Sequence, residues 1–402
     1  MNFLFISPNY PVVQYKFCTS LKTLGCNVFA IGDKPYIELN PQLKTALVEY
    51  VHVPSLDNYS DVLNAARYII QKYGELAGIE SNNEYWLGLD AYLRNALNIE
   101  GLTPQMLESY QYKSKMKKHF SAGGVATVPF VVTRQLSCAQ EFASQYGYPI
   151  FVKPDKGVGA RLAKKIQNEA ALCEFFQNPI TGEPVVQAIN EDFIFEVYIE
   201  GNIYSYDGLT DKSGNIVLEA AHLFTAPIDK LKETGGECVY YTLKNIPPKL
   251  RDIGRKTVSV FSLSGRLFHI EFFELTKPIK NVGKAGDFVG LEVNMRAAGG
   301  CTPEMINMVK EVDIYKLWAE VVANRIIPQC KTSNKYFCAN VGRHSQKQYL
   351  YSIDQIREKF PLAVVSAEQT ETSASPFGNF EIYGRFTTLN EAEEFCKFVK
   401  ET

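Results

Sequence analysis

The sequence lacks several patterns that would assign it to a class at once. It has no run of the roughly 20 apolar residues that a membrane-spanning helix needs. Its formal net charge of −2 provides no basic surface for nucleic acid or for an anionic membrane. Its first residues carry no basic segment ahead of an apolar run, so they predict a first core strand and not a signal peptide.

Cysteine is present but unpatterned. The nine cysteines are odd in number and scattered, and no Cys-x-x-Cys occurs. This usage argues against a disulfide framework and against a zinc site, and it predicts reduced thiols in a cytoplasmic protein.

Two common nucleotide-binding motifs are also missing. No Gly-x-Gly-x-x-Gly follows the first expected strand, where Ser7-Pro8-Asn9-Tyr10-Pro11 stands instead. No Gly-x-x-x-x-Gly-Lys-Ser/Thr occurs either. Neither a dinucleotide-binding fold nor a P-loop is therefore indicated.

The pattern that is present predicts both α/β and α+β organisation. A chain of 402 residues should hold two or three packed units. The first third alternates strands with helices, which favours a Rossmann-like parallel sheet covered on both faces. From about residue 336 the order is strand, strand, helix, strand, strand, helix, typical of a small α+β unit.

Three oxygen-bearing side chains carry the strongest chemical signal. Glu271 lies among apolar residues on one expected strand, and Glu292 and Asn294 lie two apart on another, so the latter two share a face. Magnesium prefers oxygen ligands and usually shares them with nucleotide phosphates. The alternative, core strands with edge carboxylates, has to explain the cost of burying unpaired acids. We expect a Mg²⁺ site here, with Mn²⁺ as a substitute.

An anion pocket is predicted next to these ligands. Arg296 follows Asn294 by two residues, and Gly299 and Gly300 come directly after. A guanidinium binds carboxylates bidentately, and glycines would leave space and N–H donors beside it.

A second anion-binding segment ends another expected strand. Lys153 precedes a loop that contains Gly157 and Gly159, which would let backbone N–H groups approach a phosphate. Taken alone, this segment is explained equally well by a surface hairpin. About forty residues on, Glu196, Val197 and Ile199 form an extended segment able to face an adenine ring.

The order and spacing of these motifs resemble the ATP-grasp superfamily, in particular its carboxylate–amine ligase and biotin carboxylase-like members. The resemblance covers roughly residues 1–325 and is compatible with the rest. It implies an N-terminal pre-ATP-grasp domain at 1–112, a two-lobed ATP-grasp domain at 113–334 with a lid at about 131–188, and a C-terminal α+β subdomain at 335–402.

The resemblance also implies roles for residues. Lys113 and Lys153 would contact ATP, with Lys115 as a competitor of Lys113, and the glycine loop would hold phosphates. Glu196 would hold adenine together with the backbone of Val197 and Ile199. The metal ligands would be Glu271, Glu292 and Asn294, and the substrate residues Arg296, Gly299 and Gly300.

The implied reaction is formation of an acyl phosphate from a carboxylate, most simply an amino acid, followed by attack of an amine. The expected partners are therefore small molecules, and a homodimer is compatible. A bicarbonate-activating, biotin carboxylase-like enzyme is one alternative, although the run Gln-x-Glu-His is missing after Arg296. A non-catalytic ATP-binding sensor or scaffold is another.

Four further residues have simpler interpretations. Asp207 precedes a glycine and is expected in a turn. His222 and His269 flank site strands and are expected to be core or supporting histidines, with a catalytic role as the alternative. Glu84 lies where a substrate-side loop is expected.

Overall fold

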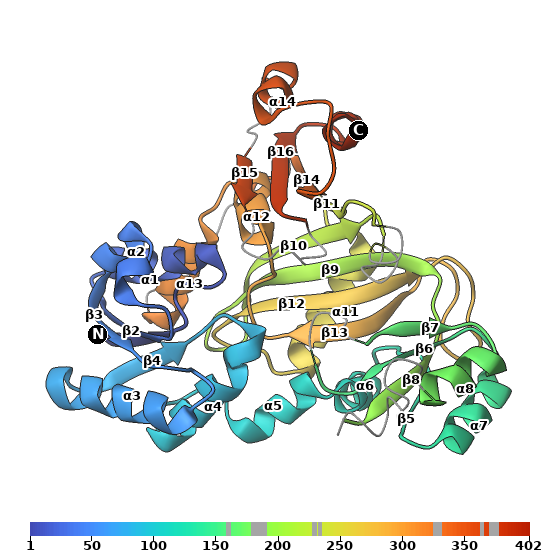
Figure 1. Ribbon diagram of the computed structural model, residues 1–402, viewed down its shortest axis with the longest axis horizontal. Coiled ribbons are helices and arrows are strands. Elements are labelled where there is room, and N and C mark those ends of the chain that lie inside the picture. Colours follow the sequence, from blue (N-terminus) through green and yellow to red (C-terminus); the bar gives the residue numbers. More distant parts are fainter. Residues whose placement is uncertain are drawn as a thin grey trace.

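The protein is described by a computed structural model that covers residues 1–157, 162–177, 191–226, 231, 235–324, 332–361, 366–369 (backbone) and 378–402. Its strands form three sheets, which Figure 1 shows side by side. The predicted combination of α/β and α+β structure is confirmed. No helix among the described residues is long and apolar enough to cross a membrane.

The N-terminal unit is the predicted parallel sheet, in the order β3-β2-β1-β4. Helices cover it, and α4 leads into α5 (Figure 1). Its elements are β1 (Asn2–Ile6), α1 (Tyr15–Thr23), β2 (Asn27–Gly32), α2 (Pro41–Ala46), β3 (Leu47–His52), α3 (Tyr59–Tyr73), β4 (Leu76–Glu80), α4 (Leu87–Ala96) and α5 (Pro104–Gln111). Three short 3₁₀ helices, at Val12–Gln14, Tyr36–Glu38 and Glu84–Trp86, lie in its loops.

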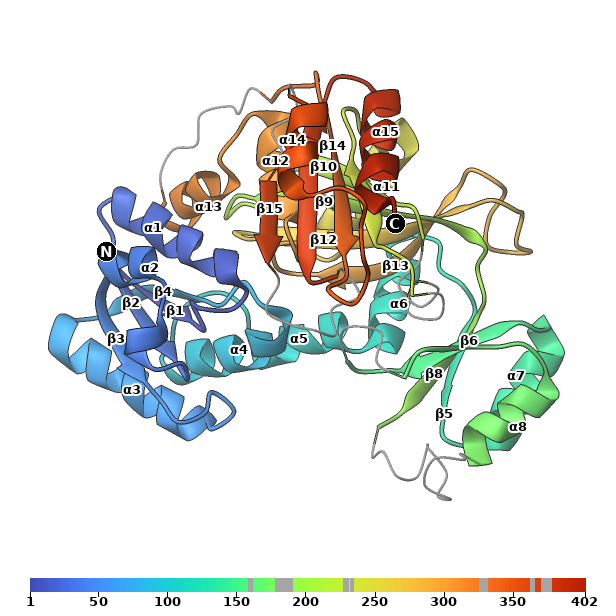
Figure 2. The same cartoon turned by 45° about the horizontal axis from the view of Figure 1, so that its top comes forward.

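A small antiparallel sheet, β5-β8-β6-β7, lies at the other end of the molecule and carries two helices (Figure 2). It contains the described parts of the expected lid, whose residues 158–161 and 178–188 lie outside the description. Its elements are β5 (Phe130–Thr133), α7 (Leu136–Tyr146), β6 (Ile150–Pro154), β7 (Lys164–Ile166), α8 (Glu169–Gln177) and β8 (Phe193–Val197).

The central sheet has eight strands in the order β13-β12-β9-β10-β11-β14-β16-β15. Its first five strands belong to the middle of the chain. They and the nearby helices are β9 (Gly201–Thr210), β10 (Ile216–Phe224), β11 (Val239–Thr242), α11 (Pro248–Val260), β12 (Leu267–Leu275), β13 (Phe288–Asn294), α12 (Thr302–Lys310) and α13 (Ile314–Val322).

The C-terminal unit continues this same sheet. It contributes β14 (Phe337–Arg343), α14 (Ile353–Lys359), β15 (Ser366–Gln369), β16 (Phe380–Phe386) and α15 (Leu389–Lys400). Because β14 pairs with β11, the C-terminal α+β unit shares its sheet with the strands of the middle of the chain. The described residues contain one strand, and not the predicted two, ahead of α14, followed by two strands and a helix as expected. The pairing of β14 with β11 was not predicted, because it joins segments distant in sequence.

Side-chain alternation gives the two faces of the central sheet different surroundings at β9, β12 and β13. Tyr206, Ile270 and Val293 point to one face and pack against α11 and α6 (Lys113–Ala122). Gly254 of α11 allows the closest approach, because an added Cβ would lie 2.5 Å from the Tyr206 ring. The opposite face is apolar where Leu209, Leu218 and Leu267 pack against the N-terminal unit. It is polar along Asp207, His269 and Glu271, and this part is called the polar face below.

The helices α5 and α6 are separated by a single residue, Tyr112. Tyr112 has an extended backbone and separates α5 from α6, because it forms a β-bridge with Lys156. Asp155 then accepts hydrogen bonds from the Ser114 amide at 2.7 Å and from its hydroxyl at 2.6 Å. A carboxylate there satisfies the amides at the start of the helix and favours its dipole, so α6 begins at this loop.

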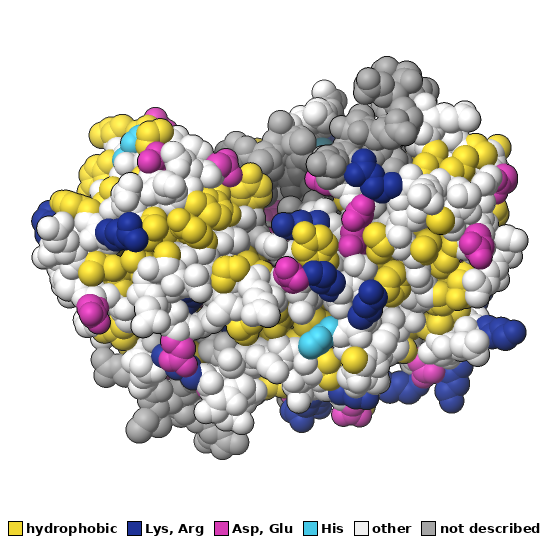
Figure 3. All heavy atoms as spheres, turned by 90° about the horizontal axis from the view of Figure 1, so that it is seen from below, with side chains coloured by type: hydrophobic (Ala, Val, Ile, Leu, Met, Phe, Trp, Pro, Cys, Tyr) yellow, Lys and Arg dark blue, Asp and Glu magenta, His cyan; other side chains and the backbone are white. Residues whose placement is uncertain are grey.

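The surface has no single dominant charge on the face seen in Figure 3, where positive and negative side chains are interspersed with hydrophobic ones. This agrees with the small net charge.

Gly254→Ala is expected to destabilise the fold by about 1–3 kcal/mol through overpacking against Tyr206. Alanine gains about 1 kcal/mol of helix propensity over glycine, but the ring cannot yield because it is fully buried and its hydroxyl donates to Glu219 at 2.6 Å. Urea unfolding measures the change. Ser259→Ala, at an exposed position of the same helix, is the control and should shift stability by less than about 0.5 kcal/mol. Equal stability of Gly254→Ala and the parent would contradict the packing.

Candidate active site

The predicted metal ligands lie together on the polar face of the central sheet. Glu271 on β12 is directly opposite Glu292 on β13, and His269 is opposite Asn294. Opposed residues of antiparallel strands share a face, with Cβ atoms about 4.5–5.5 Å apart. Glu271, Glu292 and Asn294 therefore form one cluster of oxygen donors.

A buried hydrogen-bonded chain lies beside this cluster. His269 Nε2 is 3.1 Å from Glu271 Oε1, and His269 Nδ1 is 2.6 Å from Asp207 Oδ1. The other oxygen of Asp207 lies 2.7 Å from His222 Nδ1 and also accepts from the Ser205 hydroxyl. The expectation of a turn at Asp207 is wrong, because this residue is in the middle of β9 and pairs with His269 and Ala220.

The hydrogen bonds of this buried chain fix the protonation states of His269 and Asp207. Burial alone would lower the pKa of His269, but the carboxylates of Asp207 and Glu271 outweigh it and raise the pKa to about 10. Burial would raise the pKa of Asp207, and the two imidazoles instead hold it well below its usual range. His269 is therefore a cation between two anions at neutral pH.

The lysines of the small sheet and of α6 meet at Glu196. Its carboxylate lies 2.9 Å from Lys117 Nζ and 3.0 Å from Lys153 Nζ. Burial opposes ionisation of Glu196, but the two ammonium groups lower its pKa to about 2. Burial lowers the pKa of Lys117. That of Lys153 is raised despite burial, because Glu196 and then Glu292 attract its charge.

Glu196 is thus paired with two lysines, and its expected role in holding adenine stays a prediction. Lys117 was not predicted as a site residue. The available signal was its position four residues after Lys113, on the same helix face.

The two candidates for the first lysine lie in different surroundings. Lys113 Nζ donates to the Gly157 carbonyl at 2.7 Å and is 4.0 Å from Glu292 Oε1. Lys115 is exposed and pairs with Glu108 instead. The structure therefore brings Lys113, and not Lys115, to the cluster of acids.

Arg296 lies at the end of β13 next to the N-terminal unit. Its Nε donates to Glu84 Oε2 at 3.0 Å and its Nη1 to the Ala297 carbonyl at 2.8 Å. Within the described residues its Nη2 makes no hydrogen bond. Burial raises the pKa of Glu84, against the opposing effect of Arg296.

The glycines that follow differ in their constraints. Gly300 has a φ of +60° and a Cβ there would meet the Glu381 carboxylate at 2.6 Å, so this position requires glycine. A Cβ at Gly299 would meet nothing within 4 Å. Open space therefore lies beside Gly299 but not beside Gly300.

The adenine-facing segment and the glycine loop are only partly described. Residues 198–200 connect the small sheet to the central sheet. The Val197 amide donates to the Pro129 carbonyl at 3.1 Å, and Ile199 packs in an apolar cluster with Val128, Leu275 and Val289. Gly157 has a φ of +141°, and Gly159 lies outside the described residues.

The donor set fits a hard cation shared with a nucleotide. Glu271, Glu292 and Asn294 offer oxygen only. Within the described part of the chain no three His, Cys, Asp or Glu side chains form a ready-made metal centre. Two carboxylates and one amide would thus need oxygens from a ligand such as a polyphosphate to complete a coordination shell.

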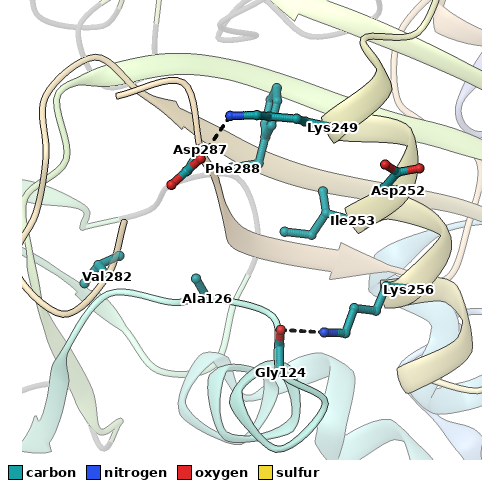
Figure 4. A pocket seen from close by; sticks show the side chains of 9 residues that line it. All are labelled: Gly124, Ala126, Lys249, Asp252, Ile253, Lys256, Val282, Asp287 and Phe288. Carbon is teal, nitrogen blue, oxygen red and sulfur yellow. Dashed lines mark hydrogen bonds and ion pairs between the residues drawn. The ribbon is translucent and has the colours of Figure 1, made fainter. Parts of the chain in front are cut away.

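A separate cavity of about 410 Å³ contains none of these residues (Figure 4). It lies between α11 and the segment after α6, on the side of the sheet that carries Tyr206. Lys249 donates there to Asp287 and Lys256 to the Gly124 carbonyl, at 3.0 and 2.7 Å. Because none of the predicted site residues lines this cavity, the candidate active site is the polar face. The cavity lies on the opposite side of the sheet.

No family model matches the sequence. Solved structures match it over nearly its whole length. The L-amino acid ligase of Bacillus licheniformis aligns with a TM-score of 0.74 and 16% identity, covering 99% of this chain and 96% of that one. This chain has the ATP-grasp fold.

A second structure with this ATP-grasp fold is the biotin carboxylase domain of the Hydrogenobacter thermophilus 2-oxoglutarate carboxylase, a dimer in complex with MgADP, ADP and bicarbonate. It aligns with a TM-score of 0.71 and 17% identity over 99% of this chain and 89% of that chain. The resemblance inferred from sequence is confirmed at the level of fold.

Curated relatives match shorter stretches. The L-arginine-specific L-amino acid ligase of Bacillus subtilis is 22% identical over 268 residues, which are 66% of this chain and 62% of that protein. The 2-oxoglutarate carboxylase small subunit of Hydrogenobacter thermophilus is 28% identical over 116 residues, 28% of this chain and 24% of that protein. Each match spans less than two thirds of the relative's length.

Lys117→Met is expected to lower the free energy of unfolding by about 3 kcal/mol, because it leaves the buried Glu196 with only one of its two cations. Lys115→Met is the matched control on the same helix. Its ion pair is exposed, so its loss should cost less than about 1 kcal/mol. Chemical denaturation compares the two, and equal effects would contradict the assigned role of Lys117.

Proposed function

We propose that this protein is an ATP- and Mg²⁺-dependent ligase that activates a carboxylate, most simply that of an amino acid, as an acyl phosphate and joins it to an amine. The single observation that carries the proposal is the placement of Glu271, Glu292 and Asn294 on one sheet face, with Arg296 beside them. The names of the relatives support the same class of reaction.

The nucleotide would lie between the small sheet and the central sheet. Lys113 and Lys153 would neutralise phosphate charge, with the backbone at Gly157 close to the phosphates. One such charge about 4 Å from a phosphate is worth roughly 4 kcal/mol at an effective dielectric near 20. The adenine ring would lie along residues 198–200, against Ile199.

Glu196 takes a role different from the expected one. Since it is already paired with Lys117 and Lys153, we propose that it orients Lys153 toward the phosphates. Val197 would contribute its apolar side chain and not its amide, because that amide is already bonded to Pro129.

Glu271, Glu292 and Asn294 would hold Mg²⁺, which when bound would neutralise charge on the transferred phosphoryl group. Arg296 would orient the substrate carboxylate through its Nη2 side, with Gly299 leaving space for the acid. A carboxylate oxygen attacks the γ-phosphorus and ADP leaves. The amine nitrogen then attacks the acyl carbon, loses a proton, and inorganic phosphate leaves.

The direct test is ADP release by the purified protein with ATP, Mg²⁺ and a panel of amino acids offered singly and in pairs. We expect ADP formation that depends on a carboxylate and product formation that depends on an amine. Release that depends on bicarbonate without an amine would favour a carboxylase, and tight ATP binding without turnover in any mixture would favour a sensor. Either result would contradict the proposal.

Glu292→Gln is expected to lower kcat/KM by about 100-fold or more, since each 1.36 kcal/mol of lost transition-state stabilisation is tenfold in rate. The free energy of unfolding should change by less than about 1 kcal/mol. The side chain is partly exposed, and the loss of its negative charge relieves repulsion with Glu271. Steady-state kinetics and thermal melting measure the two effects. Unchanged turnover would refute the metal assignment.

Arg296→Ala is expected to raise the KM for the carboxylate about 10- to 100-fold, the loss expected for charge-assisted hydrogen bonds. The Kd for ATP should stay within about twofold, because the partner of Arg296 is the acid. Arg296→Lys keeps the charge opposite Glu84 but lacks the planar fork, so it should still raise this KM. A collapse of ATP affinity in both variants would show that Arg296 belongs to the nucleotide site.

A further inference from the structure

The exposure of the side chains increases along the hydrogen-bonded chain that ends at Glu271. Ser205 and His222 are fully buried, Asp207 is 2% exposed and His269 is 8% exposed, whereas the Glu271 side chain is 25% exposed. The chain thus runs from the interior to the polar face, and its accessible end is Glu271.

Asp207 is held from three sides. Its Oδ1 accepts from His269, and its Oδ2 accepts from His222 and Ser205. These partners come from the adjacent strands β12 and β10 and from β9 itself, so the carboxylate is fixed by the sheet. Asp207 therefore fixes the orientation of the His269 ring.

His269 in turn holds only one oxygen of Glu271. Its Nε2 faces Oε1 at 3.1 Å. Across the described ranges Glu271 has no other hydrogen bond, so its Oε2 is available to a ligand. Glu271 also lies opposite Glu292, and like charges there repel each other. An N–H donor on Glu271 keeps its carboxylate in place against this repulsion.

We propose that His269, locked by Asp207, is a positioning residue that presents Glu271 Oε2 to the divalent cation. This inference rests on the proposed metal site. His222 and Ser205 serve it by anchoring Asp207. Outer partners of this kind typically account for 10- to 100-fold in metal affinity.

The experiment measures metal-dependent nucleotide binding and needs no turnover. The Kd of a non-hydrolysable ATP analogue is measured by calorimetry with Mn²⁺ and again with EDTA. The Kd with EDTA divided by the Kd with Mn²⁺ gives the contribution of the metal, and this quotient is called the ratio below. General structural damage weakens both values, whereas misplacement of Glu271 weakens only the Mn²⁺ value.

The two amide variants of His269 separate its two contacts. Asparagine can keep the donor near the position of Nδ1, facing Asp207, but does not reach Glu271, whereas glutamine can place a donor near the position of Nε2. We expect His269→Asn to reduce the ratio about 10-fold and His269→Gln to recover part of this loss. His52→Asn, an exposed histidine on β3, is the control and should leave the ratio unchanged.

The same measurement tests whether Asp207 fixes the orientation of His269. Asp207→Asn should reduce the ratio as His269→Asn does, with the EDTA value within about twofold of the parent. Should Asp207→Asn fail to fold, Ser205→Ala replaces it, because that change removes a single hydrogen bond to Asp207. It should reduce the ratio by about two- to threefold.

Two negative results are distinguishable. A parent ratio near one would reject the proposed metal site itself. A large parent ratio that Glu271→Gln reduces but His269→Asn leaves intact would overturn the positioning role while the metal site stands.

Discussion

Alternation of side chains along three antiparallel strands is the constraint on which the site depends. Over residues 205–207, 269–271 and 292–294 every second residue points to the face away from α11. The registers place Asp207, His269 and Asn294 in one row and Ser205, Glu271 and Glu292 in the next. A slip of one residue would turn these groups into the apolar core. The residues that pack against α11, such as Tyr206 and Ile270, therefore fix the register of the site as well as the stability of the sheet.

A sheet face that carries so many carboxylates needs compensating charge, and the cations come from separate units. His269 provides one within the sheet. Lys113 and Lys117 come from α6, which lies along the edge strand β13, where the Val293 amide donates to the Met116 sulfur at 3.1 Å. Lys153 comes from the small sheet. Lys117 of α6 binds Glu196 of the small sheet, and Lys113 of α6 lies 4.0 Å from Glu292 of the central sheet, so α6 links the charges of the two sheets.

Local pattern was sufficient for the parallel N-terminal sheet and for placing Glu292 and Asn294 on one face of a strand. It failed where the outcome depended on contacts distant in sequence. Asp207 precedes a glycine, a common turn signal, yet strands on both sides keep it extended. From the sequence Glu196 is expected to hold adenine, and only the folded chain shows its two lysines. Likewise, Lys113 and Lys115 are equivalent by composition, and the bridge between Tyr112 and Lys156 decides which of them faces the acids.

The most direct test of the central claim is a crystal structure with a non-hydrolysable ATP analogue and Mg²⁺. The account predicts a cation bound by Glu271, Glu292 and Asn294 and shared with the analogue's terminal phosphates, with Lys153 beside the phosphates and Arg296 facing an open space. A nucleotide bound elsewhere, for example in the cavity behind the sheet at Lys249 and Lys256, or phosphates with no ion at the two glutamates, would contradict it.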